Sequence, residues 1–136
     1  MLATRNRLRT STDFSTTVRS GVRNGRRNVV LYTAALAADE PSRIGFIVSK
    51  SVGNAVVRNL VKRRLREVGA LSLQQYGSGF AIVVRALPAA AGACFEQLRS
   101  DYDAALESNM KRLGSRLPKA ASSVSYETTQ EGTPRA

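Results

Sequence analysis

The stretch that decides the fold is residues 43–67, RIGFIVSKSVGNAVVRNLVKRRLRE. Its β-branched and apolar start predicts a strand over residues 43–49, and a turn containing Gly53 follows. From Asn54 to residue 68 apolar side chains recur at helical spacing. The stripe that this helix is expected to bury consists of Val57, Val61, Leu65 and Val68.

A second face of this predicted helix is strongly basic. Arg58, Lys62 and Arg66 follow one another at about one-turn intervals, with Asn59 and Arg63 beside them. A face meant only for water would normally carry Glu–Lys pairs four residues apart, but no acidic residue interrupts this one. A solvated face remains the alternative, although the uncompensated charge favours a polyanionic partner.

The start of the helix adds a feature suited to phosphate. A helix N-terminus offers unpaired backbone N–H groups and the positive end of the helix dipole. Gly53 and Asn54 lie at this point of the chain, and Lys50 in the preceding turn adds a charge. The turn and the basic face together predict a surface for a phosphate backbone.

Two further strands are expected around this unit. Residues 28–37 predict a strand antiparallel to 43–49 across the turn at 39–41. Residues 80–85 are continuously apolar, which is typical of a central strand, and the intervening helix makes them parallel to 43–49.

Two more helices are expected at the ends of this unit. One is capped by Ser11 or Thr12 and ended by Gly21, so that Phe14 and Val18 share its inner side. The other spans residues 93–112. Its predicted buried side consists of Cys94, Leu98, Tyr102 and Ala105.

Composition limits the function classes. The 136 residues include 21 Lys and Arg against 10 Asp and Glu, a net charge of +11. Residues 1–68 hold 14 of these cations against 4 acids, whereas residues 69–136 hold 7 against 6. We therefore expect the first half to face a polyanion, nucleic acid above all.

The same composition predicts an intracellular, soluble protein. With no His and a single Cys, Cys94, neither a structural zinc site nor a disulfide framework is expected. No apolar run has the length of a membrane span, and no secretory signal is recognisable. We expect one domain over residues 1–113 and a disordered tail over residues 114–136, which are rich in Ser, Thr and Ala.

The central stretch resembles the signature of the bacterial ribonuclease P protein component. That signature has an Arg-Asn-Arg triplet followed by Lys-Arg-x-x-Arg-Glu, matched here by Arg58-Asn59, Lys62-Arg63 and Arg66-Glu67 after Gly53-Asn54-Ala55-Val56. The likeness spans roughly residues 4–110. Its other matches are Arg5-Asn6-Arg7-Leu8, Asp13-Phe14, Gly21, Val30-Leu31-Tyr32 and Val83-Val84-Arg85.

The resemblance implies an α+β fold. Helices would pack on a mixed sheet in the order α-β-β-β-α-β-α, with a left-handed βαβ crossover like that of ribosomal protein S5 domain 2. The general rule favours right-handed crossovers, so this expectation comes from the family alone. A weak stretch over residues 22–28 would supply the fourth strand.

The resemblance also implies two RNA surfaces. The catalytic RNA would contact Lys50, Gly53, Asn54, Arg58, Asn59, Lys62, Arg63 and Arg66. A cleft between the first helix and the sheet would bind the single-stranded 5′ leader of precursor tRNA through Phe14, Tyr32 and Arg85. Auxiliary phosphate contacts would come from Arg5, Arg7 and Arg9. Aromatic rings stack on unpaired bases of any sequence, although plain core packing remains the alternative for Phe14.

In such a ribonucleoprotein the RNA carries the chemistry, so no catalytic residue is expected in the protein. Mg²⁺ would be bound mainly by the RNA, with no cofactor held tightly by the protein. The expected partners are ribonuclease P RNA and precursor tRNA, in the cytoplasm, without a membrane or a protein partner.

The sequence departs from the family pattern at three positions and leaves two rival functions open. The departures are Leu60 in place of the second Arg of the triplet, Ser51 in place of a Lys, and Val18 in place of an aromatic residue. The first rival is a ribosomal or other structural RNA-binding protein with no part in catalysis. The second is a DNA-binding architectural protein, against which the stacking aromatics count.

Overall fold

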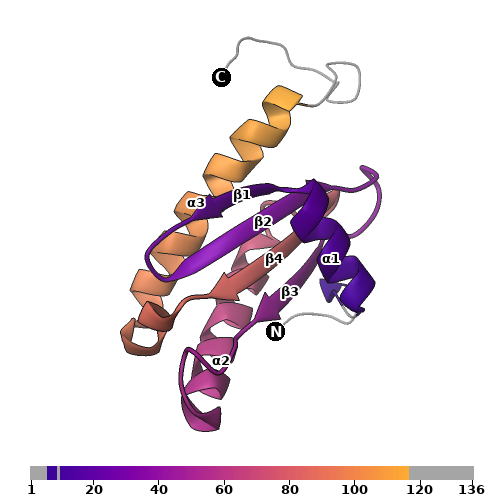
Figure 1. Ribbon diagram of the computed structural model, residues 1–136. Helices are drawn as coiled ribbons and strands as arrows, with labels where there is room; N and C mark the ends of the chain where they lie inside the picture. The colour runs from indigo at the N-terminus through magenta and orange to yellow at the C-terminus, as the bar shows by residue number, and fades with distance from the viewer. Residues whose placement is uncertain (1–5, 9, 117–136) are drawn as a thin grey trace.

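The computed structural model describes residues 6–8 and 10–116, which form a mixed sheet packed by helices (Figure 1). Its elements, in chain order, are α1 (Ser11–Ser20), β1 (Val22–Gly25), β2 (Val29–Ala35), β3 (Arg43–Ile47), α2 (Ala55–Ser72), β4 (Phe80–Ala86), the short 3₁₀ helix η2 (Pro88–Gly92) and α3 (Phe95–Arg116). The predicted α+β class and element order are confirmed, and β1 confirms the weak fourth strand.

The strands lie in the order β1-β2-β4-β3. Strand β4 is parallel to β3 and antiparallel to β2, which confirms its central position and its parallel partner. The connection from β3 through α2 to β4 is the βαβ unit that the sequence predicts. Its left-handed sense stays a prediction.

The sequence places β2 and β3 on either side of a short connection, but they are not neighbours in the sheet, because β4 lies between them. The connection between them pairs instead with the residues that lead into β4. The backbone N–H of Leu36 donates to the Gly79 carbonyl at 2.7 Å, and that of Ser42 donates to the Gly77 carbonyl at 3.0 Å. The continuously apolar β4 thereby takes the most buried position in the sheet.

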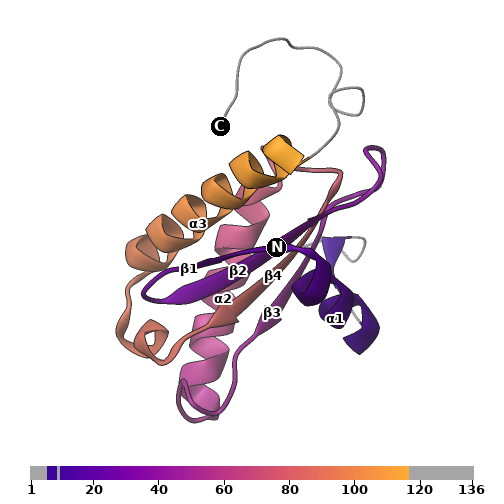
Figure 2. The same ribbon diagram turned by 45° about the horizontal axis from the view of Figure 1, so that its top comes forward.

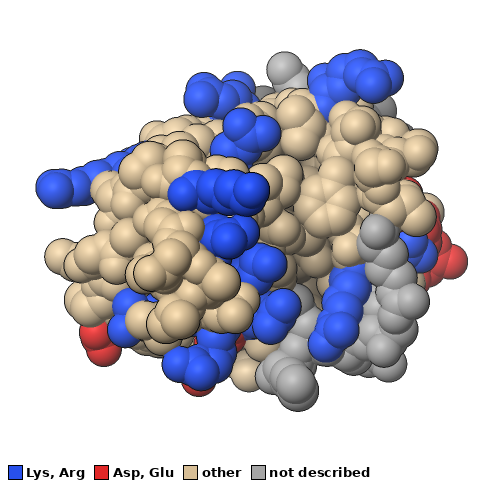
Figure 3. Space-filling view, turned by 60° about the horizontal axis from the view of Figure 1, so that its bottom comes forward, with Lys and Arg blue, Asp and Glu red and all other residues tan. Residues whose placement is uncertain are grey.

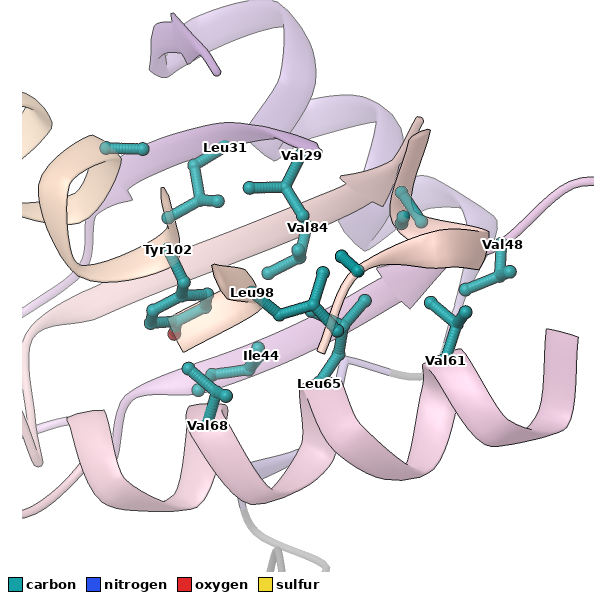
Figure 4. Packing of buried hydrophobic residues seen from close by; sticks show 14 of the residues in the cluster. Val29, Leu31, Ile44, Val48, Val61, Leu65, Val68, Val84, Leu98 and Tyr102 are labelled. Carbon is teal, nitrogen blue, oxygen red and sulfur yellow. The ribbon is translucent and has the colours of Figure 1, made fainter. Parts of the chain in front are cut away.

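Helices α2 and α3 cover one face of the sheet and enclose the core (Figures 1 and 4). Of the predicted stripe of α2, Val61, Leu65 and Val68 are buried, and Val57 is half-buried. Figure 4 shows Leu65 pointing toward Leu98 of α3. Burying an aliphatic side chain of this size stabilises a fold by about 1.5–3 kcal/mol. The core therefore fixes which side of α2 can face a partner.

Three of the four residues predicted on the buried side of the last helix are buried. Leu98, Tyr102 and Ala105 are fully buried, whereas Cys94 is exposed. Helix α3 begins only at Phe95, and the Cys94 N–H donates to the side-chain oxygen of Gln97 at 2.9 Å. Cys94 therefore precedes the helix and does not follow its periodicity.

Helices α2 and α3 both extend beyond their predicted ends at residues 68 and 112, and each of them contains a glycine. Gly69 lies inside α2, where a Cβ would come within 3.2 Å of the Phe46 ring and 3.3 Å of Ile44 Cδ1. The glycine thus lets the helix approach β3 closely. Helix α3 continues through Gly114 to Arg116. The rest of the predicted tail, residues 117–136, lies outside the described residues.

Among the helices of the described residues, α1 alone lies on the opposite face of the sheet, over one end of it (Figures 1 and 2). Helix α1 packs on β2 and β4. The predicted cap, Ser11 or Thr12, is wrong, because both residues lie inside the helix and the Thr10 side chain caps it by accepting from the Asp13 N–H at 3.0 Å. This layout leaves the other end of the face without a helix above it. We call this face of the sheet, opposite α2 and α3, together with α1 the α1 face.

Candidate nucleic-acid interface

The turn before α2 is built by local hydrogen bonds. The N–H groups of Val52 and Gly53 donate to the carbonyls of Ser49 and Lys50. Asn54 caps the helix, since its side-chain oxygen accepts from the Val57 N–H at 3.0 Å. The first turn of α2 contains no acidic residue, so the positive end of the helix dipole is not compensated there.

The basic face of α2 divides into a fixed part and an open part. Arg58 is half-buried, and its Nε donates to the Gly53 carbonyl at 3.1 Å, which ties the helix to the turn. Lys62 is half-buried, while Arg63 and Arg66 are exposed. We call Lys62, Arg63 and Arg66 the α2 cations; Asn59, also exposed, lies beside them.

No carboxylate pairs with the α2 cations in the part of the chain that the structure describes, whereas Arg99 and Asp103 of α3 form an ion pair. Arg64 follows a different course, donating to the Ala93 carbonyl at 2.8 Å and so joining α2 to the segment before α3. Figure 3 shows a band of Lys and Arg side chains across this side of the molecule, with Asp and Glu only toward its margins. Charge of one sign without internal partners is the electrostatic footprint of a polyanion-binding surface.

The α1 face brings together the residues predicted to bind a single strand. Tyr32 is in register with Val83 of β4, which is in register with Gly45 of β3, so the three share one row. Phe14 of α1 lies over Gly45, where a Cβ would come within 2.3 Å of its ring. Arg85 follows two residues after Val83 and therefore points to the same side.

Exposure on this face suits stacking. Phe14 and Tyr32 are half-buried, so each ring is held by neighbours while part of it stays accessible, and Arg85 is exposed. The position of Phe14 is therefore compatible with both core packing and base stacking, because it packs on the sheet and is still partly exposed. An aromatic surface beside a guanidinium can hold an unpaired base and its phosphate.

Sequence reasoning missed Arg23 on this face. Arg23 of β1 is the direct cross-strand partner of Tyr32, and its side chain is exposed. Residues opposite one another in an antiparallel pair point to the same side of the sheet. The sequence signal is the change from apolar Val22 to charged Arg23, which matches the buried and exposed sides of β1, and the shortness of this strand conceals it.

The N-terminal arginines are only partly placed. Arg5 and Arg9 lie outside the described residues. Arg7 is exposed and forms a parallel bridge with Ile44, while Leu8 donates its N–H to the Ile44 carbonyl at 3.1 Å. The segment thus lies along β3, at the edge of the sheet away from β1.

The three departures from the family pattern lie at positions of different exposure. Ser51 is exposed, and its hydroxyl lies 2.8 Å from that of Ser49, within the turn before α2. Leu60 and Val18 are half-buried on α2 and α1. None of these side chains carries a charge that could contact a phosphate.

Neither a metal-ligand cluster nor a membrane segment is found in the described part of the chain. Across residues 6–8 and 10–116, no three His, Cys, Asp or Glu side chains gather as a possible metal site. No helix in these ranges combines the length and the hydropathy needed to cross a bilayer. Asp101 and Asp103 have separate partners, since Asp101 accepts from Asn28 and Asp103 pairs with Arg99.

The fold and its two surfaces define a small α+β protein of the nucleic-acid-binding class. The Ribonuclease P family model matches residues 2–110. The Ribonuclease P protein component of Arthrobacter sp. (strain FB24) is 87% identical over the full length of both chains. That of Kocuria rhizophila is 55% identical, with 82% of this chain and 98% of the relative covered.

Solved structures agree with the sequence relatives. The RNase P protein of Staphylococcus aureus matches with a TM-score of 0.67 and 28% identity, over 75% of this chain and 93% of that one. The RNase P protein of Thermotoga maritima matches with a TM-score of 0.62 and 25% identity, over 85% and 100%. The chain belongs to the ribonuclease P protein family. It is a protein subunit of the ribonucleoprotein endoribonuclease ribonuclease P, and it works with the RNA of that enzyme.

The contact between Phe14 and Gly45 gives a stability prediction. In Gly45→Ala the added Cβ would overlap the Phe14 ring, so α1 has to shift. Overpacking of this kind costs about 1–3 kcal/mol, and urea unfolding measures it. Gly92→Ala is the matched control, because a Cβ at that exposed glycine meets nothing within 4 Å. Equal stability of the two variants would contradict the packing of α1 described here.

Proposed function

We propose that this subunit binds ribonuclease P RNA through α2 and the turn before it, and the 5′ leader of precursor tRNA on the α1 face. The observation that carries the proposal is that the α2 cations and the aromatic residues lie on opposite sides of the sheet. The α2 cations have no carboxylate partners in the described part of the chain, and the aromatic residues lie with Arg85 on the other side of the sheet. Strand β3 leads directly into the turn before α2, so the two surfaces adjoin.

The protein's part in cleavage is to bind and orient, and the RNA carries out the hydrolysis with Mg²⁺ that it mainly binds itself. Lys50, Asn59, Arg63 and Arg66 are exposed, as contact with an RNA backbone requires. Cations of the protein neutralise phosphates that would otherwise need metal ions to screen their repulsion. The subunit therefore lowers the Mg²⁺ concentration needed for leader removal, which takes place in the cytoplasm.

Reconstitution tests this function. The purified chain is added to its cognate ribonuclease P RNA, and removal of the leader from a precursor tRNA is measured as Mg²⁺ is titrated. We expect the protein to shift the Mg²⁺ midpoint of cleavage downward and to leave the cleavage position unchanged. An unchanged midpoint would contradict the proposed role, and the same titration with a basic protein of unrelated fold controls for non-specific screening by charge.

A further inference from the structure

A cluster of arginines lies at the β1 edge of the sheet, where it adjoins the α1 face and extends beyond it. Its members are Arg23 on β1, Arg26 and Arg27 after it, and Arg112 on α3; we call them the β1-edge cluster. Strand β1 is hydrogen-bonded only to β2, so its other side forms the edge of the sheet. All four side chains are exposed, and within the described residues none pairs with a carboxylate.

Backbone and amide oxygens hold two members of the cluster in place. Arg112 donates to the Arg23 carbonyl at 2.6 Å, which occupies an acceptor on the edge strand. Arg26 donates to the side-chain oxygen of Asn24 at 2.9 Å. These acceptors are neutral, so they orient the guanidinium groups without removing their charge. Charged side chains on an edge strand disfavour its pairing with another strand, and exposed cations without carboxylate partners attract an anion.

One carboxylate on the neighbouring part of α3, that of Asp101, is already engaged. Asp101 is half-buried and accepts from both the backbone N–H and the side-chain amide of Asn28, at 3.0 and 2.9 Å. Asp101 therefore holds the connection between β1 and β2 in place and does not pair with Arg26 or Arg27, which precede Asn28.

Arg23 joins this cluster to the α1 face. Its side chain runs along β1, since a Cβ on Gly25 would lie 4.0 Å from its Nη2. Gly25 is in register with Val30, and Val30 with Arg85. The head of Arg23 therefore lies near the row of Arg85, two strand spacings away, or about 10 Å.

We propose that the β1-edge cluster binds phosphates of the precursor tRNA leader after the strand has crossed Tyr32, with Arg23 as its first contact. This inference rests on the proposed leader-binding role of the α1 face. Arg23 and Arg85 flank Tyr32, so a base stacked on this ring has a guanidinium on either side for its phosphates. Continuity with Tyr32 favours the leader over ribonuclease P RNA, because α2 packs on the opposite face of the sheet.

Arg23→Gln tests the proposal, because only the carbonyl of Arg23, not its side chain, holds Arg112. Binding is measured for three probes: a precursor tRNA with a leader of about eight nucleotides, within the roughly 4–16 that single-strand-binding folds occupy, the mature tRNA, and ribonuclease P RNA alone. One lost single-strand phosphate contact lowers the salt slope by about 0.7, equivalent to about fivefold in affinity at 0.1 M salt. We expect this loss for the precursor only, and the same for Arg27→Gln.

Arg99→Gln is the matched control, because it removes one exposed charge from α3 at a residue that pairs with Asp103. It should leave all three affinities unchanged. Unchanged precursor binding by Arg23→Gln, an equal loss for mature tRNA, or a loss for ribonuclease P RNA would each overturn the inference. A wild-type protein that binds precursor and mature tRNA equally would instead overturn the leader-binding function itself.

Discussion

Replacing the α2 cations together, as Lys62→Gln, Arg63→Gln and Arg66→Gln, is expected to weaken binding to ribonuclease P RNA about 100- to 500-fold at 0.1 M salt. Each phosphate contact contributes about 0.7–0.9 to the salt slope, which corresponds to about five- to eightfold in affinity at this concentration. The slope itself should fall by about two to three. Titration of labelled RNA at several salt concentrations measures both quantities.

The loss should come from binding and not from unfolding, because none of these side chains donates a hydrogen bond to another of the described residues. Arg58, by contrast, holds the Gly53 carbonyl, so its removal would mix a structural effect with an electrostatic one. The matched control is Arg63→Lys with Arg66→Lys, which keeps the charge and should keep the slope. A triple variant with wild-type slope and affinity would exclude this face as the RNA surface.

Most of the fold is predictable because the deciding patterns are local. The helix from Asn54 follows from the spacing of Val61, Leu65 and Val68, all of which are buried. Its true end at Ser72 is not predictable in this way. Gly69 breaks the pattern locally but lies close to Phe46, a residue more than twenty positions away, whose ring a Cβ at this position would crowd.

Strand neighbours are harder to predict because pairing is not local. Residues 28–37 and 43–49 adjoin in the sequence, which suggests a hairpin, yet β4 from beyond α2 takes the place between them. Cys94 illustrates the same limit at smaller scale. Its spacing fits the buried stripe of α3, but the helix begins one residue later and leaves it exposed.

The sequence predicts which types of residue form the candidate site better than it predicts what each residue does there. The family pattern marks Arg58 with the other cations of α2, but the structure ties its guanidinium to the turn. Arg23 carries no motif at all and becomes visible only through its register with Tyr32. The packing of the helix determines what Arg58 contacts, and strand pairing determines where Arg23 lies. The local sequence predicts neither.

The leader-binding role of the α1 face predicts that Tyr32→Ala weakens precursor tRNA binding and leaves mature tRNA binding unchanged. Loss of one aromatic stacking platform costs about 1–3 kcal/mol per base, which is about 5- to 150-fold in affinity. The ring is half-buried, and Tyr32 has Arg23 of β1 on one side and Val83 of β4 on the other as its partners in register. Its neighbours therefore hold it in place before RNA binds. Affinity titrations of both RNAs against the wild type measure the difference.

Tyr32→Phe separates stacking from hydrogen bonding and from folding. It keeps the aromatic face and removes only the hydroxyl, so a stacking role requires wild-type affinity for the precursor. Tyr32→Ala should unfold cooperatively like the wild type, since its neighbours Val30 and Val83 remain buried. Equal losses for precursor and mature tRNA would mean that Tyr32 supports the body of the tRNA or the fold. Loss in Tyr32→Phe as well would assign the contact to the hydroxyl, because a base that stacks on the ring does not sense the missing oxygen.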